Sequence, residues 1–360
     1  MPAGQITVSD VTAALADFRD PESGRPAVEM GQIRDIQTDG RRVSLTLALT
    51  TMAAPLWEEA RAECAALLRQ KFPGAAEIEV KLGIHERKPQ PLGEIGVTAK
   101  CVIAVGSGKG GVGKSTIAAS LAYGLHLAGA KVGLMDADVY GPSIPHLIGV
   151  NHRPEVHEGK IQPIEVDGMK VMSMGFLIPP GEAVVWRGPM LHGAIQQFLR
   201  DTAWGDLDYL IIDMPPGTGD IALTLSQLLP LTGAVIVCTP QDVALLDAVK
   251  AIAMFRKVNI PVLGMVENMS YFICPDNGKQ YDIFGHGGAK KKAAELEIPF
   301  LGEAPININM RIRGDEGRIA GNFSDETIAP YLQALCHNLV KNLATARRER
   351  PPLPTLNVLR

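Results

Sequence analysis

The hydrophobic pattern divides the chain into two stretches with different periodicity. In the first 82 residues, apolar positions alternate with polar ones or recur at helical spacing, which is typical of a small module with one buried face. From Cys101 onward, short segments that are apolar at every position alternate with helical stretches. Strands that are apolar on both faces, with helices between them, predict a mostly parallel sheet covered by helices on both sides. The predicted fold class is therefore α/β, with a small α/β domain ahead of a larger one.

Individual elements follow from the same pattern. In the first stretch we expect helices over 10–18 and 57–71 and strands over 43–49 and 78–82. In the second we expect strands over 101–105, 131–135, 170–174, 209–212, 234–239 and 261–266. Helices are expected over 115–128, 188–200, 243–258, 289–296 and 324–346. The predicted domains are 1–82 and 101–346, with a Pro- and Gly-containing linker over 83–100 and a tail over 347–360.

Composition and charge narrow the class of protein. The chain has 360 residues, which at roughly 150 residues per domain suits two or three domains. Its 35 basic and 39 acidic residues give a net charge of −4, which argues against a general nucleic-acid binder. No apolar run approaches the ~18 residues of a membrane helix, and the first residues lack a secretory pattern. We expect a cytoplasmic protein that binds neither nucleic acid nor membrane.

The strongest local motif is a glycine-rich loop between the strand 101–105 and the helix 115–128. It fits the pattern GxxxxGK[ST], and the residues expected to bind nucleotide there are Gly108, Lys109, Gly110, Gly111, Val112, Gly113, Lys114, Ser115 and Thr116. Glycines let the backbone N–H groups approach phosphate oxygens closely, and the new helix adds its positive dipole end. Lys114 is expected to supply positive charge at the β- and γ-phosphates, and Ser115 to bind Mg²⁺.

The second lysine of this loop, Lys109, indicates which group of phosphate-loop proteins the motif resembles. A second lysine in GKGGxGK[ST] resembles the deviant Walker A group that includes MinD, ParA, the nitrogenase iron protein and the Mrp proteins. This resemblance implies a homodimer in which Lys109 reaches the phosphates bound by the partner subunit. A cation that arrives in trans offsets charge on the transferred phosphoryl group, as an arginine finger does.

Acidic residues follow two of the predicted strands. Asp213 ends the strand 209–212 and opens the string Asp-Met-Pro-Pro-Gly, a candidate γ-phosphate-sensing loop. A carboxylate at the carboxyl end of a strand beside the phosphate loop suits a Mg²⁺ partner. Asp136 and Asp138 end the strand 131–135. The resemblance implies that Asp138 orients the attacking water and that Asp136 supports Mg²⁺.

The nucleotide base is predicted from a later segment. GTPases of this fold read guanine with an Asn-Lys-x-Asp loop, whereas this chain has Asn-Met-Ser-Tyr from Asn268, without the carboxylate that guanine requires. The amide of Asn268 suits adenine, so ATP is the expected nucleotide.

Further strings resemble the Mrp family of P-loop iron–sulfur cluster carriers. They lie at 105–116, 136–143, 213–220, 266–270 and 283–288, within a resemblance that covers about 101–345. Residues 1–82 resemble the small iron–sulfur-assembly domain often fused ahead of such proteins, through Asp20-Pro21-Glu22 and Thr50-Thr51. The resemblance implies a homodimeric ATPase that assists assembly or transfer of iron–sulfur clusters to apoproteins.

The chain departs from this family at its cysteines. The family has Cys-x-x-Cys after the Asn-Met-Ser segment, whereas here Cys274 is followed at the second position by Asn277, and no cysteine follows Thr51. A symmetric dimer would then offer two thiolates instead of the usual four. Three interpretations stay open: Asp276 or His286 completes a mixed-ligand site, paired Cys274 residues bind a cluster weakly, or the ATPase carries none.

Two other functional classes are also considered. One is a cluster-free, ATP-driven protein switch that recognises partners through residues 1–82. The other is a positioning ATPase of the MinD or ParA sort, which the net acidity and the weakly amphipathic C-terminal helix disfavour. The remaining four cysteines lie among apolar residues and are expected to fill the core: Cys64, Cys101, Cys238 and Cys336.

Overall fold

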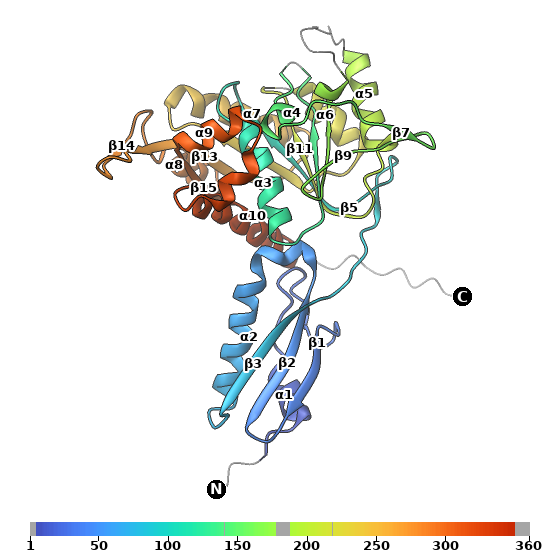
Figure 1. Ribbon diagram of the computed structural model, residues 1–360, viewed down its shortest axis with the longest axis vertical. Coiled ribbons are helices and arrows are strands. Elements are labelled where there is room, and N and C mark those ends of the chain that lie inside the picture. Colours follow the sequence, from blue (N-terminus) through green and yellow to red (C-terminus); the bar gives the residue numbers. More distant parts are fainter. Residues whose placement is uncertain (1–4, 140, 178–187, 218, 350–360) are drawn as a thin grey trace. The chain divides into compact units, whose positions relative to one another are not determined.

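The computed structural model describes residues 5–139, 141–177, 188–217 and 219–349 (Figure 1). It divides into two compact units, one of residues 1–87 with 340–360 and the other of residues 88–339, called unit 1 and unit 2 below. The stretch 83–100, expected to be a linker, instead contains the last residues of strand β3 (Glu77–Ile84), all of β4 (Pro91–Leu92) and the start of β5 (Val97–Gly106). Gly93 and Gly96, both with positive φ, lie in the tight turn between β4 and β5.

Unit 1 has a three-stranded sheet in the order β1-β2-β3, with β1 (Ile33–Thr38) antiparallel and β3 parallel to β2 (Arg42–Leu49). It also has helices α1 (Val8–Ala14) and α2 (Trp57–Lys71), the 3₁₀ helix η1 (Thr51–Leu56) and residues 340–349 of the last helix. Alternate residues of β2 pack against one face of α2 and are almost fully buried: Val43, Leu45, Leu47 and Leu49.

The sequence pattern did not predict β1. This strand carries an irregularity between Arg34 and Gln37, where Asp35 has a positive φ of 52°. A bulge shifts the alternation of inward and outward side chains, so the period-2 signal is lost. Helix α1 is also shorter than expected: it starts from a capping box of Thr7 and Asp10 and ends at Ala14.

Unit 2 is built on a ten-stranded sheet whose main path is β14-β13-β12-β5-β11-β6-β10-β9, with β15 beside β13 and β4 beside β5. From β13 to β10 along this path, neighbouring strands are parallel, and β15 is parallel to β13. The strand bounds are β6 (Val132–Asp136), β9 (Ile164–Val166), β10 (Met169–Ser173), β11 (Leu207–Asp213), β12 (Gly233–Cys238), β13 (Val262–Ile273), β14 (Gln280–Tyr281) and β15 (Phe300–Ile306). A small hairpin pairs β7 (Val156–His157) with β8 (Lys160–Ile161).

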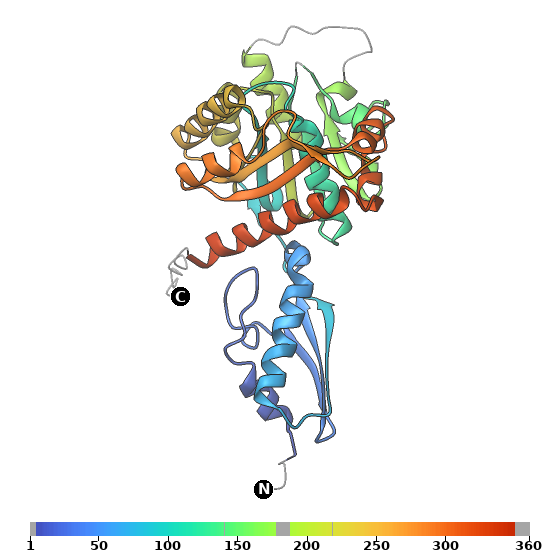
Figure 2. The same ribbon diagram turned by 90° about the vertical axis from the view of Figure 1, so that its left-hand side faces the viewer.

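Helices cover this sheet on both faces (Figures 1 and 2). They are α3 (Lys114–Leu127), α4 (Ile144–Leu147), α5 (Gly188–Asp201), α6 (Gly219–Leu228), α7 (Asp242–Lys257), α8 (Gly288–Glu295), α9 (Ile308–Asp315) and α10 (Ala329–Glu349), with 3₁₀ turns η2 (Met174–Phe176) and η3 (Ile319–Ser324). Apolar side chains of α5 to α8 join one core cluster with the central strands. Helix α3 packs against the central strands β11 and β6 and also against η3 and α10, where a Cβ on Gly124 would meet the Cys336 sulfur at 2.4 Å. The predicted α/β architecture is thereby confirmed.

Two predictions near the C-terminus need correction. The last helix begins at Ala329 instead of residue 324, because η3 precedes it and Asp325 accepts the Thr327 N–H in a turn between them. Residues 347–349 of the expected tail belong to that helix, and residues 350–360 lie outside the described residues.

Candidate functional site

The glycine-rich loop connects β5 to α3, as the sequence predicts. Gly111 and Gly113 both have a φ of +80°, a conformation that residues with a side chain rarely adopt. A Cβ at Gly108 would lie 2.1 Å from the backbone carbon of Asp247 in α7. A Cβ at Gly113 would lie 2.1 Å from the amide nitrogen of Asn268. The loop is therefore a tight backbone cradle into which two neighbouring segments are packed.

The cradle opens into a cleft of about 410 Å³. The N-cap of α3 is Gly113, which provides no side chain for the first N–H groups of this 14-residue helix. Unsatisfied N–H groups at a helix N-terminus, together with the helix dipole, attract phosphate. Besides the loop, the cleft is lined by Asp138, Gly141, Ser143, His146, Leu147 and Pro216.

Lys114 lies at the bottom of this cleft among acidic side chains. Its Nζ donates to Asp213 Oδ1 at 2.6 Å and to Ser115 Oγ at 3.2 Å, and it is 3.5 Å from Asp138 Oδ2. The side chains of Lys114, Asp138 and Asp213 are 6%, 8% and 0% exposed. The structure thus brings together four of the residues that the sequence proposed for phosphate and metal chemistry.

Strand register explains this convergence. Asp213 at the end of β11 is paired with Asp136 at the end of β6 on one side and with Val105 of β5 on the other. Asp136 is fully buried and accepts hydrogen bonds from the N–H groups of Asp138 and Ile144 and from Ser173 Oγ. Adjacent parallel strands therefore deliver two carboxylates and the phosphate loop to the same edge of the sheet.

Burial changes the acidity of both inner carboxyls. Loss of hydration, together with the nearby Asp213, raises the pKa of Asp136 to about 8. Burial also raises the pKa of Asp213, while the ammonium of Lys114 acts in the opposite direction. The cleft therefore concentrates acidic groups around one buried lysine.

These residues fit a magnesium ion. Asp213 Oδ2 is buried and has no hydrogen-bond partner among the described residues. The Ser115 hydroxyl lies nearby, because it accepts a hydrogen bond from Lys114, which also donates to Asp213. Mg²⁺ prefers such oxygen ligands together with phosphate oxygens and water. Asp136 is the register neighbour of Asp213 on β6, and its support of the ion stays a prediction.

Lys109 and the loop after Asp213 lie at the mouth of the cleft. Lys109 is half-buried, lines the cleft and forms no ion pair with another described residue. The Gly217 N–H donates to the Ser107 carbonyl at 2.9 Å, so the loop after β11 touches the phosphate loop directly. Thr218 in this loop and Tyr140 in the 136–143 string lie outside the described residues.

Asn268 makes a contact that the sequence did not predict. Its Nδ2 donates to the Val112 carbonyl at 2.9 Å, and the residue is 5% exposed. This bond attaches β13 to the phosphate loop, while the adenine contact stays a prediction. Sequence reasoning also missed Ser173, which bonds Asp136 from β10, and Ser143 and His146 in the cleft wall. The last two lie only a few positions beyond Asp138, which is the signal that could have found them.

Cys274 lies in the turn between β13 and β14. Its N–H donates to the Lys279 carbonyl at 3.0 Å, and its carbonyl accepts from the Gly278 N–H at 2.8 Å. The side chain of Asn277 accepts the Lys279 N–H at 2.9 Å, so this asparagine holds the turn. His286, considered above as a partner for Cys274, instead bonds Glu303 at 3.0 Å.

The other four cysteines are buried, whereas Cys274 is partly exposed. Burial raises the pKa of the Cys64, Cys238 and Cys336 thiols to about 12. A thiol with so high a pKa is a poor nucleophile and a poor metal ligand at neutral pH. Cys274 is accordingly the accessible thiol of the chain.

Unit 1 has its own buried acidic residue in the Asp20-Pro21-Glu22 turn. Glu22 is 3% exposed, is hydrogen-bonded by Thr50, and pairs with Arg87 at 2.9 Å and with Arg347 at 2.7 Å. Arg347 also donates to the sulfur of Met52, in the segment where the family resemblance implies a cysteine. The segment after Thr51 therefore has the thioether of Met52 and no thiol.

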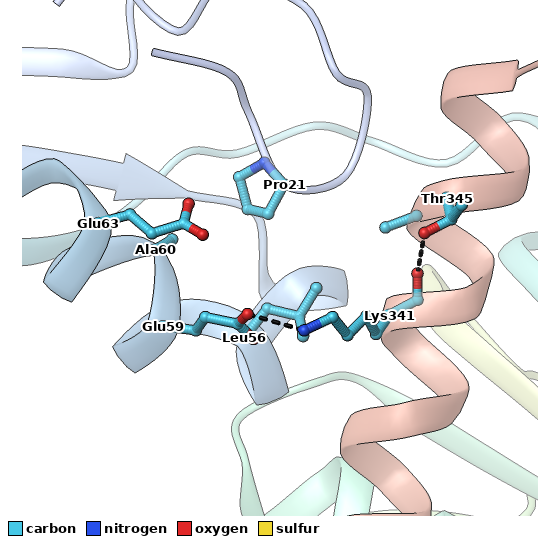
Figure 3. A pocket seen from close by; sticks show the side chains of 8 residues that line it. Pro21, Leu56, Glu59, Ala60, Glu63, Lys341 and Thr345 are labelled. Carbon is cyan, nitrogen blue, oxygen red and sulfur yellow. Dashed lines mark hydrogen bonds and ion pairs between the residues drawn. The ribbon is translucent and has the colours of Figure 1, made fainter.

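Unit 1 also contains a small pocket of about 210 Å³ between α2 and the last residues of α10 (Figure 3). In it Lys341 donates to Glu59 at 2.8 Å, close to Pro21 and Ala60. Its wall combines apolar residues with the charged side chains of Glu59, Glu63 and Lys341.

A phosphate loop with two lysines, an open helix N-terminus and carboxylates at adjacent strand ends together define a P-loop nucleotide-binding protein. Residues 98–340 match the family model described as NUBPL iron-transfer P-loop NTPase, and residues 9–82 match that of an iron-sulfur cluster assembly protein. The chain belongs to this family of iron-transfer P-loop NTPases.

Individual relatives agree with this assignment. The chain is 47% identical over 348 residues to an iron-sulfur cluster carrier protein of Deinococcus radiodurans, covering 95% of this chain and 98% of the relative. A nucleotide-binding protein from Archaeoglobus fulgidus, solved with ADP, is 44% identical with a TM-score of 0.56 over 62% of this chain and 88% of that one. The cell division ATPase MinD of Pyrococcus furiosus, at 23% identity and a TM-score of 0.51 over 67% of this chain and 99% of that one, shares the fold.

Among the described residues, no helix is long and apolar enough to cross a bilayer.

Proposed function

We propose that this protein binds and hydrolyses ATP and uses that cycle to assist assembly or transfer of iron–sulfur clusters to apoproteins. The observation that carries the proposal is the position of Lys114, buried between Asp213, Asp138 and Ser115 at the head of a phosphate loop in an iron-transfer family. The buried Lys114 ammonium, which pairs with carboxylates here, can pair with a triphosphate instead, because the triphosphate carries more negative charge.

The chain's own residues divide the work at the phosphates. Lys114 and the N–H groups from Gly110 to Ser115 would bind the β- and γ-phosphates. Ser115 and the unpartnered Asp213 oxygen would hold magnesium, with Asp136 supporting the ion through its neighbours. Magnesium, when bound, neutralises the charge that develops on the phosphate oxygens.

The remaining steps need a nucleophile and a second cation. Asp138 Oδ1 accepts a hydrogen bond from the Gly141 N–H at 3.2 Å, and its Oδ2 is 3.5 Å from Lys114 Nζ. This position at the cleft suits holding the attacking water in line. Lys109 would act across a homodimer, since it lines the cleft without an ion pair to any described residue of its own chain.

Cys274 is the residue proposed to contact the cluster cargo. Two copies of the chain would present two thiolates, and Asn277 adds no soft ligand. Fewer thiolates hold a cluster less tightly, which favours release to an acceptor that supplies its own cysteines.

A second candidate is an ATP-driven protein switch without a cluster. Two departures from the family favour it: Asn277 stands at the second cysteine position, and no cysteine follows Thr51 in unit 1, where Arg347 donates to the sulfur of Met52. In this case residues 1–82 would recognise the partner.

Anaerobic reconstitution with iron and sulfide, followed by transfer to an apoenzyme that needs a [4Fe–4S] cluster, separates the two candidates. The carrier function predicts a visible cluster chromophore, its loss in Cys274→Ser, and slower transfer without ATP. Lys109→Ala should keep ATP affinity within about threefold and lose turnover by about 10³-fold, the range for a cation supplied in trans. Acid-labile sulfide at the level of a Cys274→Ser control would exclude the carrier and leave the switch.

A further inference from the structure

Unit 2 contains a second group of polar side chains that the nucleotide chemistry does not use. Glu267, His286 and Glu303 place one nitrogen and two carboxylate oxygens within 4.8 Å of one another. We propose that these three residues bind a single divalent transition-metal ion. The proposal depends neither on ATP hydrolysis nor on a cluster at Cys274.

The sheet itself brings the two glutamates together. β13 and β15 are adjacent parallel strands, and their register pairs Glu267 directly with Glu303. The third residue, His286, precedes α8 in a turn that contains Gly285 and Gly287, with φ of 91° and 77°. The ligands therefore come from two fixed strands and one tight turn.

Each side chain is already oriented for a shared ion. Glu267 Oε1 accepts from Ser270 Oγ at 2.5 Å and from the Gly287 N–H at 2.8 Å, and its Oε2 accepts from the Ala289 N–H at 2.7 Å. The His286 ring meets Tyr271 edge-on, with centroids 5.1 Å apart. Hydrogen bonds that fix ligands in this way are typical of the surroundings of metal sites.

The charges at this position favour a cation. Glu267 is completely buried, and like charges directly opposite each other on neighbouring strands destabilise a sheet. Among the described residues, no lysine or arginine pairs with either glutamate, and the hydrogen bonds to Glu267 come from neutral groups. Among the residues that the structure describes, the contact to Glu303 from a potentially basic group comes from His286, whose Nε2 is 3.0 Å from Glu303 Oε2.

The donor set indicates the type of ion. One imidazole nitrogen with carboxylate oxygens suits Zn²⁺, Fe²⁺ or Co²⁺, whereas Mg²⁺ and Ca²⁺ prefer oxygen alone. The site is open to solvent on one side, because the side chains of His286 and Glu303 are 38% and 29% exposed. An ion can therefore enter without unfolding of the sheet.

Cobalt titration of the metal-stripped full-length protein tests the proposal. We expect one Co²⁺ per chain by calorimetry, with visible absorption that Zn²⁺ displaces, and at least tenfold weaker binding in His286→Ala and Glu303→Gln. Glu155→Gln is the matched control, since Glu155 forms an exposed pair with His157 at 2.8 Å, and it should bind cobalt like the parent. Cys274→Ser should also bind cobalt normally.

ATP affinity, measured in the same variants, shows whether each one is folded and keeps this test separate from the proposed function. The site is refuted if the parent protein binds no cobalt, or if Cys274→Ser abolishes cobalt binding. It is also refuted if His286→Ala and Glu303→Gln have normal ATP affinity and bind cobalt as tightly as the parent does. If His286→Ala and Glu303→Gln lose ATP affinity, the milder His286→Gln replaces them, and retained cobalt binding in that variant refutes the site equally.

Discussion

The nucleotide cleft and the Cys274 turn are the two regions of unit 2 to which the proposed function assigns roles, and they are built in different ways. In the cleft, Lys114, Asp138 and Asp213 are each less than 10% exposed, with Lys114 at the start of α3, Asp213 at the end of β11 and Asp138 just beyond β6. In the turn, Cys274 is partly exposed and is held by backbone hydrogen bonds and by Asn277. The cleft has every residue that the phosphate motif requires. The turn has one cysteine, whereas the resemblance to the Mrp family implies two.

The difference follows from how each region is stabilised. Replacing a buried residue of the cleft leaves an uncompensated charge or a steric clash, which costs several kcal/mol. Replacing a partly exposed residue of a turn costs about 1 kcal/mol or less, so the thiol site can change while the fold stays intact. We therefore expect substitutions in the Cys274 turn to leave the nucleotide cleft intact.

The largest effect is expected from Lys114→Ala. This change removes the cation nearest to the phosphates and the partner of Asp213 at 2.6 Å. ATP turnover should fall by at least about 10³-fold, measured by phosphate release, with weaker ADP binding by calorimetry. Lys250→Ala serves as control, because Lys250 is 79% exposed and pairs only with Asp247 at 3.0 Å among the described residues. Turnover within tenfold of the parent would contradict the assignment.

Thiol labelling compares the two regions directly. Because burial raises the pKa of Cys64, Cys238 and Cys336 to about 12, few of these thiols are ionised at pH 8. Iodoacetamide should therefore modify Cys274 at least about 100-fold faster than any other cysteine of the native protein, as measured by peptide mass spectrometry. In denaturant all five should react at similar rates. Equally slow labelling of Cys274 would show that its thiol is protected.

Gly113→Ala and Gly111→Ala separate backbone strain from steric clash in the phosphate loop. Both glycines have a φ of +80°, yet an added Cβ meets Asn268 at 2.1 Å at Gly113 and meets nothing within 4 Å at Gly111. Gly111→Ala should lower the free energy of unfolding by about 1–2 kcal/mol, and Gly113→Ala by more than that. Urea unfolding measures both values, and equal losses would indicate that Asn268 moves away freely.

The smallest effect is expected from Asn277→Cys, which restores the family's second cysteine. Loss of the bond from the Lys279 N–H should cost about 1 kcal/mol locally, and the proposed homodimer would gain two thiolates. Iron retained after desalting should rise about twofold over the parent protein, and ATP turnover should stay unchanged. Unchanged iron would show that the turn does not face a second copy.

Much of the nucleotide site was predictable from sequence because its residues follow short-range rules. The loop from Gly108 to Ser115 is contiguous, and its glycines are needed by local backbone geometry. Asp136 and Asp213 were found because acidic residues that end apolar strands meet at one edge of a parallel sheet.

Other features were decided only by the tertiary structure. The bond from Asn268 to Val112, the support of Asp136 by Ser173, and the pairing of Glu267 with Glu303 join residues that are far apart in sequence. Such contacts depend on which strands are neighbours and in what register, and a shift of one residue would turn each side chain to the opposite face. The local sequence pattern therefore determined which residues are available to bind phosphate. Strand packing determined which side chains hold those residues in place, and where Glu267 and Glu303 meet as a second group of candidate ligands.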